Sequence, residues 1–174
     1  MRKNKKRNHQ KHPVPNHKYK DRLFRLVFNN KRDLLDLYNA LNNTCYENPN
    51  DLEVNTLEDA VYLSMKNDIS FLIGGTLNLY EHQSTYNPNM PLRGLIYLAR
   101  LYDGYVETKN INLYSSSLKK LPIPQYFVFY NGTKEQPDET ILQLTDAFES
   151  VSDNRQPCLQ CTAVMLNINY GHNL

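Results

Sequence analysis

The pattern of hydrophobic and polar positions predicts a chain that mixes helices with strands. Between residues 21 and 41, apolar residues recur at three- and four-residue spacing with a break at Asn29-Asn30, which predicts one broken helix or two abutting helices. A second helical pattern runs over residues 91–108, and Asn89 is its expected N-cap. The residues expected on the apolar face of that helix are Leu92, Leu95, Ile96, Ala99, Tyr102 and Tyr105.

Residues 67–84 carry the strongest local signal in the sequence. Two β-prone runs are joined by Gly74-Gly75, and a type I′ turn needs positive φ at both central positions, so we expect a hairpin. Opposed residues in this hairpin have numbers that sum to 149, which sets Asp68 against Glu81. Alternation puts Glu81 and Gln83 on one face and His82 on the other. Both faces carry apolar residues, so we expect an α/β or α+β fold with layers on both sides of the sheet.

Two further strands are predicted in the second half of the chain. The run 125–130 reads as a buried strand that ends at Asn131-Gly132, and 162–169 reads as the last strand. Residues 115–120 and 134–139 have the composition of loops. The stretch 52–65 carries both helical and strand signals, and its structure stays open.

Composition indicates one ordinary domain without a membrane segment. The 174 residues are 40% hydrophobic and include 13 Tyr and 6 Phe, enough apolar volume for a core. No window approaches the ~18 to 20 uninterrupted apolar residues of a spanning helix. The N-terminus lacks the apolar segment of a secretory signal, and three widely spaced cysteines make a disulfide framework improbable. A reducing bacterial cytoplasm is the expected compartment.

Charge divides the chain into a basic arm, residues 1–20, and a body, residues 21–174. The arm holds eight Lys/Arg and no acid, which leaves the body with 12 basic and 18 acidic residues, a net charge of −6. Such an arm is expected to be flexible. It either attracts nucleic-acid phosphates or only solubilises the chain. The arm residues expected to contact nucleic acid are Arg2, Lys3, Lys5, Lys6 and Arg7.

The opposed carboxylates of Asp68 and Glu81 form the candidate site. Their Cβ atoms would lie roughly 4.5 to 5.5 Å apart, and the resulting repulsion would be relieved by a divalent cation, Mg²⁺ or Mn²⁺. Gln83, about 7 Å further along the same strand face, could present its amide to a phosphate or to an attacking water. Phosphodiester hydrolysis fits this set of groups. The alternative is two solvated acids at the open end of a hairpin.

Five short blocks of sequence stand out together. They are DRLFR at 21–25, KNDIS at 66–70, LYEHQS at 79–84, MPLRGL at 90–95 with Tyr97, and YNG at 130–132. With them the chain resembles the recombination-promoting nuclease / putative transposase family of the PD-(D/E)XK nuclease superfamily, over roughly residues 20 to 172. The EHQS block followed closely by MPLRGLIY is the most specific part of the resemblance.

The resemblance implies a restriction-endonuclease-like core, a mixed β-sheet flanked by helices, that cleaves double-stranded DNA with Mg²⁺ in bacterial recombination or transposition. Asp68 would be the metal-binding Asp, Glu81 the second metal ligand, and Gln83 the occupant of the superfamily's lysine position. Gln83 can orient water but carries no charge, so Arg93, which starts the next helix, is a candidate to position the phosphate. The alternative is a surface or structural arginine. Family members generally continue beyond the point that corresponds to Leu174, so residues 21–174 would be a C-terminally shortened domain.

Three other interpretations compete with a nuclease. The chain could be a catalytically inactive, shortened DNA-binding remnant, or a protein-interaction module with no nucleic-acid role. Cys158 and Cys161 offer half of a zinc site, but no second pair with suitable spacing follows, so two reduced thiols are the preferred interpretation.

Overall fold

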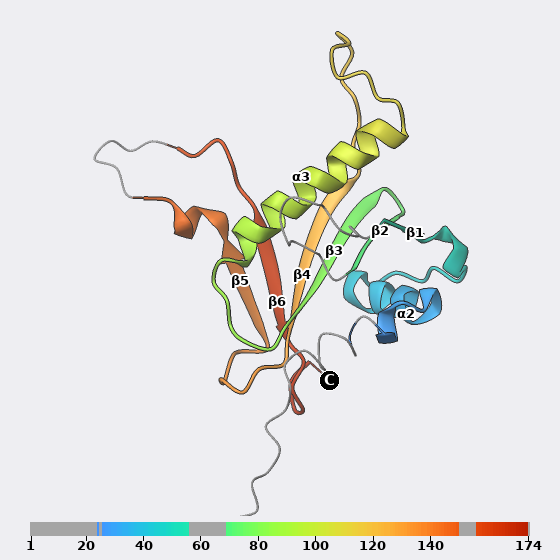
Figure 1. Ribbon diagram of the computed structural model, residues 1–174. Helices are drawn as coiled ribbons and strands as arrows, with labels where there is room; N and C mark the ends of the chain where they lie inside the picture. The colour runs from blue at the N-terminus through green and yellow to red at the C-terminus, as the bar shows by residue number, and fades with distance from the viewer. Residues whose placement is uncertain (1–23, 25, 56–68, 150–155, 174) are drawn as a thin grey trace, which may run out of the picture.

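The computed structural model describes residues 24, 26–55, 69–149 and 156–173 (Figure 1). Over these residues the fold is α/β, with a mixed six-stranded sheet flanked by helices, as expected. The elements in chain order are α2 (Lys31–Asn42), the 3₁₀ turn η1 (Pro49–Asp51), β1 (Glu53–Val54), β2 (Ile69–Ile73), β3 (Thr76–Gln83), α3 (Met90–Thr108), β4 (Ile123–Tyr130), β5 (Glu139–Gln143), the 3₁₀ turn η2 (Leu144–Ala147) and β6 (Thr162–Asn167). Within the described part of the chain, no helix has both the length and the apolar character needed to cross a bilayer.

The strand order in the sheet is β1-β2-β3-β4-β6-β5. β3 pairs with β4 in parallel and β4 pairs with β6 in parallel, whereas the β1-β2, β2-β3 and β5-β6 pairs are antiparallel. α3 is the crossover connection between β3 and β4, and it lies across one face of the sheet (Figure 1). The carboxyl ends of β3, β4 and β6 therefore meet at one edge of the sheet.

The β2-β3 hairpin has the predicted turn and register. Gly74 and Gly75 both have positive φ, 56° and 82°, as a type I′ turn requires. The opposed pairs run from Ile73 and Thr76 next to the turn to Ile69 and Tyr80 at the far end, and every pair sums to 149. Asp68, the next residue in the sequence, lies outside the described residues.

The break predicted in the first helical region is present. Residues 24 and 26–28 are helical, and a turn at 29–30 separates them from α2. The side chain of Asn30 accepts a hydrogen bond from the backbone N–H of Arg32 at 2.9 Å and caps α2. In the stretch whose structure stayed open, residues 53–54 form β1, and everything from residue 56 onward in that stretch lies outside the described residues.

Both faces of the hairpin are buried, as the apolar residues on both faces predicted. Leu77 and Leu79 face α3, in a cluster that includes Leu98 and Leu101 of that helix. The opposite face packs against α2 in a second cluster, which contains Leu34, Leu35, Tyr38, Ile69, Phe71, Ile73, Tyr80 and Phe129. β3 therefore lies between two apolar layers, and its alternate side chains enter different environments.

The bounds of α3 are predicted to within one residue, but its predicted apolar face is only partly correct, since Leu95 and Tyr102 pack against the core while other members of that face do not. Leu92 is 45% exposed and Ala99 is exposed, while the buried residues are Met90, Pro91, Gly94, Tyr97, Leu98 and Leu101. The reason is the absence of a side chain at Gly94. A Cβ there would overlap the Tyr126 ring, so the helix lies close to the sheet at the glycine, and the residues on either side of Gly94 on the same face, such as Met90, Tyr97 and Leu101, are the ones that become buried.

Residues 115–120 are irregular, and β4 and β6 cover the predicted strands, with β6 ending at Asn167 rather than at residue 169. β5 was not predicted. It is an edge strand in which only Leu142 is buried, so its sequence has too few apolar residues to stand out from a loop.

The two glycines of α3 give a matched test of this packing. We expect Gly94→Ala to destabilise the fold by about 1 to 3 kcal/mol, because the new methyl group overlaps the Tyr126 ring. Gly104→Ala adds a Cβ with no atom within 4 Å and should stabilise the helix by roughly 0.5 to 1 kcal/mol. Urea unfolding of both variants measures the difference, and equal effects would contradict close packing at Gly94.

Candidate functional site

Glu81 is a buried carboxylate on the α3 face of the sheet. It is the third residue from the carboxyl end of β3, and its side chain is 1% exposed. Arg93 comes from the first turns of α3, and its Nη2 donates to Oε2 of Glu81 at 2.9 Å. The predicted alternation along β3 and the predicted start of α3 thus bring two of the candidate residues into direct contact.

Arg93 is fixed by more than the carboxylate. Its Nη2 also lies 3.4 Å from the hydroxyl oxygen of Tyr97, one turn further along α3, and Nη1 lies 3.5 Å from the sulfur of Met90. Burial alone would lower the pKa of Arg93, but the hydrogen bond to Tyr97 and the negative charge of Glu81 raise it. The guanidinium therefore stays charged. About one third of its side chain is exposed, so it connects the buried carboxylate to solvent.

Tyr126 of β4 forms part of the same site, and nothing in the sequence pattern pointed to it. Its ring fills the space over Gly94, and its buried hydroxyl group has no hydrogen-bond partner in the part of the chain that the structure describes. Burial, with the nearby charge of Glu81 as a second cause, raises the pKa of Tyr126 well above its usual value. Tyr126 is therefore neutral, and the charged groups of the site among the described residues are Glu81 and Arg93. A close approach between a helix glycine and a strand aromatic leaves no local signal in the sequence.

The remaining candidates are placed as follows. Gln83 is the last residue of β3 and is partly exposed, and its backbone carbonyl accepts a hydrogen bond from the N–H of Asn131 at 3.1 Å. His82 lies on the other face and stacks on Phe24 with ring centroids 5.4 Å apart, which fits its predicted packing role. Asp68 and the basic-arm residues lie outside the described residues.

The chemistry of the donor groups suits a hard cation only in part. Mg²⁺ commonly takes one or two carboxylates and keeps water in its other positions, and Glu81 can supply one of them. Among the described residues there is no group of three or more His, Cys, Asp or Glu side chains that could hold a metal. Arg93 already supplies positive charge to Glu81, so a cation on that carboxylate would compete with the guanidinium. Cys158 and Cys161 are free thiols, the first exposed and the second buried.

No protein-family model, curated protein or solved structure matches the chain. The position of the site is nevertheless informative. Glu81 and Arg93 meet near the carboxyl ends of the parallel strands β3 and β4, and open α/β sheets commonly bind their ligands just outside that edge.

Removing Arg93 should destabilise the protein more than removing Glu81. Arg93→Gln leaves a carboxylate that is 1% exposed without its guanidinium and should cost about 3 to 5 kcal/mol. Glu81→Gln leaves a guanidinium that reaches water and should cost less. Arg32→Gln is the control, because its ion pair with Asp36 is exposed and worth roughly 0.5 kcal/mol or less. Denaturant unfolding measures all three, and a smaller loss for Arg93→Gln than for Glu81→Gln would contradict the buried ion pair.

Proposed function

We propose that this protein is a Mg²⁺-dependent DNA endonuclease of the PD-(D/E)XK type, associated with recombination or transposition of a bacterial mobile element. One observation carries the proposal. Glu81 and Arg93 come from the two blocks that make the resemblance most specific, LYEHQS and MPLRGL, and their side chains are in direct contact at the carboxyl ends of parallel strands. The mixed sheet flanked by helices also fits a restriction-endonuclease-like core.

Each residue has a distinct role in the proposed site. Glu81 and Asp68 would hold the metal, which when bound would supply a Lewis acid and a water of lowered pKa. Gln83 would orient the attacking water through its amide. Arg93, which stays protonated, would donate to the oxygens of the scissile phosphate once it leaves Glu81, since a guanidinium can bind two phosphate oxygens at once.

Nicking of supercoiled plasmid tests the activity. In Mg²⁺ we expect the purified protein to convert supercoiled into relaxed circles, and EDTA to abolish the conversion. Glu81→Gln and Asp68→Asn should each lower the rate by at least ~100-fold, because a neutral amide is a poor ligand for Mg²⁺. Glu139→Gln is the matched control. This exposed glutamate of β5 lies on the same sheet outside the site, and its variant should nick at the wild-type rate. Equal nicking by Glu81→Gln and Glu139→Gln would rule out the proposed site.

A second function is favoured by one specific observation. The positive charge of the Arg93 guanidinium already balances the negative charge of Glu81, so this carboxylate needs no metal ion beside it. That is what a catalytically inactive DNA-binding remnant would show. In that case the protein binds DNA without cutting it, and Mg²⁺ changes neither binding nor plasmid topology.

Salt dependence measures the attraction to DNA that both functions share. Arg2, Lys3, Lys5, Lys6 and Arg7 replaced together by Gln should weaken binding equally for all sequences. The slope of log K against log salt should become shallower by up to about 4 to 5, near 0.9 for each phosphate that the arm no longer neutralises. Fluorescence anisotropy with two unrelated duplexes measures both effects. An unchanged slope would mean that the arm does not bind phosphate.

A further inference from the structure

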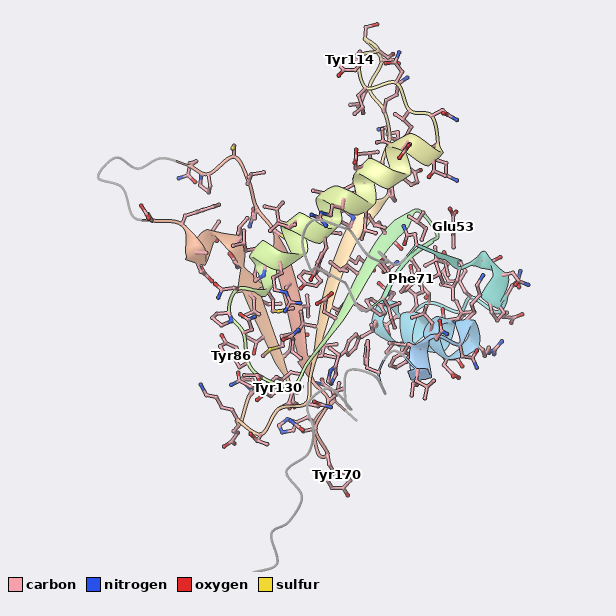
Figure 2. The ribbon with its side chains drawn as sticks, viewed as in Figure 1. Glu53, Phe71, Tyr86, Tyr114, Tyr130 and Tyr170 are labelled. Atoms are coloured by element: carbon pink, nitrogen blue, oxygen red, sulfur yellow. The ribbon has the colours of Figure 1, made fainter. Side chains whose placement is uncertain are left out.

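A second site lies at the other half of α3, on the side of β1 and β2. A cavity of about 160 Å³ opens there between the strands and the helix, and an adjoining depression of about 250 Å³ shares four of its residues. Glu53 of β1, labelled in Figure 2, marks the strand side of the cavity, and Arg100 and Lys109 line its helix side. Arg93 and Arg100 are seven residues apart, about 10 Å along the axis, so this cavity is distinct from the Glu81 site.

Two buried polar atoms in the cavity have no hydrogen-bond partner among the residues that the structure describes. They are Nη1 of Arg100 and Oδ1 of Asn55, and both residues are partly exposed as a whole. Leaving a buried polar group unsatisfied is destabilising, and more so where the group is charged. A ligand with a negatively charged acceptor for Arg100 and a hydrogen-bond donor for Asn55 would satisfy both atoms.

The other lining groups narrow the chemistry further. Lys109 and Glu53 lie 3.9 Å apart and offset each other's charge, so Arg100 is left as the excess positive charge of the cavity. Tyr105 and Thr108 add hydroxyl groups to the lining, which suits an acceptor with more oxygens than a carboxylate has. Beside them Gly104 leaves open space, because a Cβ there would meet no atom within 4 Å.

We propose that this cavity binds a phosphate group that carries its own hydroxyl, either free hydrogen phosphate or the monoanion of a phosphate monoester, whose second pKa is about 6. The oxygens of the phosphate accept from Arg100 and the neighbouring donors, and its P–OH donates to Oδ1 of Asn55. Sulfate and phosphodiesters have the charge but no such hydroxyl group, so they leave Asn55 unsatisfied.

Thermal unfolding of the full chain tests the site, with inorganic phosphate as the probe and sulfate and chloride at equal ionic strength as references. At ten times its Kd, phosphate should raise the Tm by about 3 °C or more, and sulfate should raise it clearly less. Arg100→Gln should lose the phosphate response because the charged donor is removed, and its Tm without phosphate should equal or exceed that of the wild type because a buried N–H group without a partner is removed. Arg32→Gln, on the exposed surface of α2, should keep the wild-type response.

Asn55→Ala separates recognition of the hydroxyl group from general attraction of anions. We expect it to fold and to respond equally to phosphate and sulfate. The proposal is overturned if the wild type shows no response at about 10 mM phosphate, if sulfate matches phosphate in the wild type, or if Arg100→Gln retains the response. The measurement is made in EDTA without Mg²⁺, so its result is independent of nuclease activity.

Two competition experiments distinguish the possible sources of the phosphate. If AMP competes with inorganic phosphate and adenosine does not, the cavity admits a mononucleotide monoester. If a 5′-phosphorylated duplex competes and the 5′-hydroxyl duplex does not, it admits a strand end. Competition by the unphosphorylated ligands would contradict recognition of a phosphate group.

Discussion

The register of β3 is the constraint on which the rest of the structure depends. Both faces of this strand are buried, so a slip of one residue would place His82 beside Arg93 and Glu81 in the aromatic layer with Phe24. Two pairings prevent the slip. The Gly74-Gly75 turn fixes β3 against β2, and all eight residues of β3 pair in parallel with β4. The contact between Glu81 and Arg93 follows from that register and from the start of α3.

The ion pair explains how a carboxylate can remain in an apolar layer. Removing a carboxylate from water costs several kcal/mol, and the guanidinium 2.9 Å away offsets that cost only while it remains close. If Arg93 turns to a phosphate, another cation has to take its place beside Glu81. In the proposed nuclease, Glu81 would hold the metal and Arg93 would turn toward the substrate, a movement for which its one-third exposed side chain leaves room.

Local chemistry made part of this structure predictable from the sequence. The glycine pair dictates the hairpin, and Pro91 in the first turn favours the start of α3, without reference to distant residues. Asn89 holds the predicted N-cap position, although its side chain makes no capping hydrogen bond. The buried face of α3 could not be predicted in the same way, because it depends on the ring of Tyr126, which is 32 positions away from Gly94. The position of Arg93 at the start of a helix made it a candidate. Its contact with Glu81 was not predicted, because it too depends on how the helix packs on the sheet. β5 was not predicted, because an edge strand buries too few side chains to give an alternating pattern of apolar and polar residues.

The two arginines of α3 differ in what the strands offer them. Seven residues apart, they point from nearly the same side of the helix. β3 meets Arg93 with a carboxylate, whereas the cavity presents Arg100 with Leu72, an amide oxygen, and a glutamate offset by a lysine. An apolar side chain at position 100 would fill that space without the penalty of an unpartnered charge. Stability alone therefore accounts for Arg93 but not for Arg100, and a bound anion supplies the interaction that the protein itself does not.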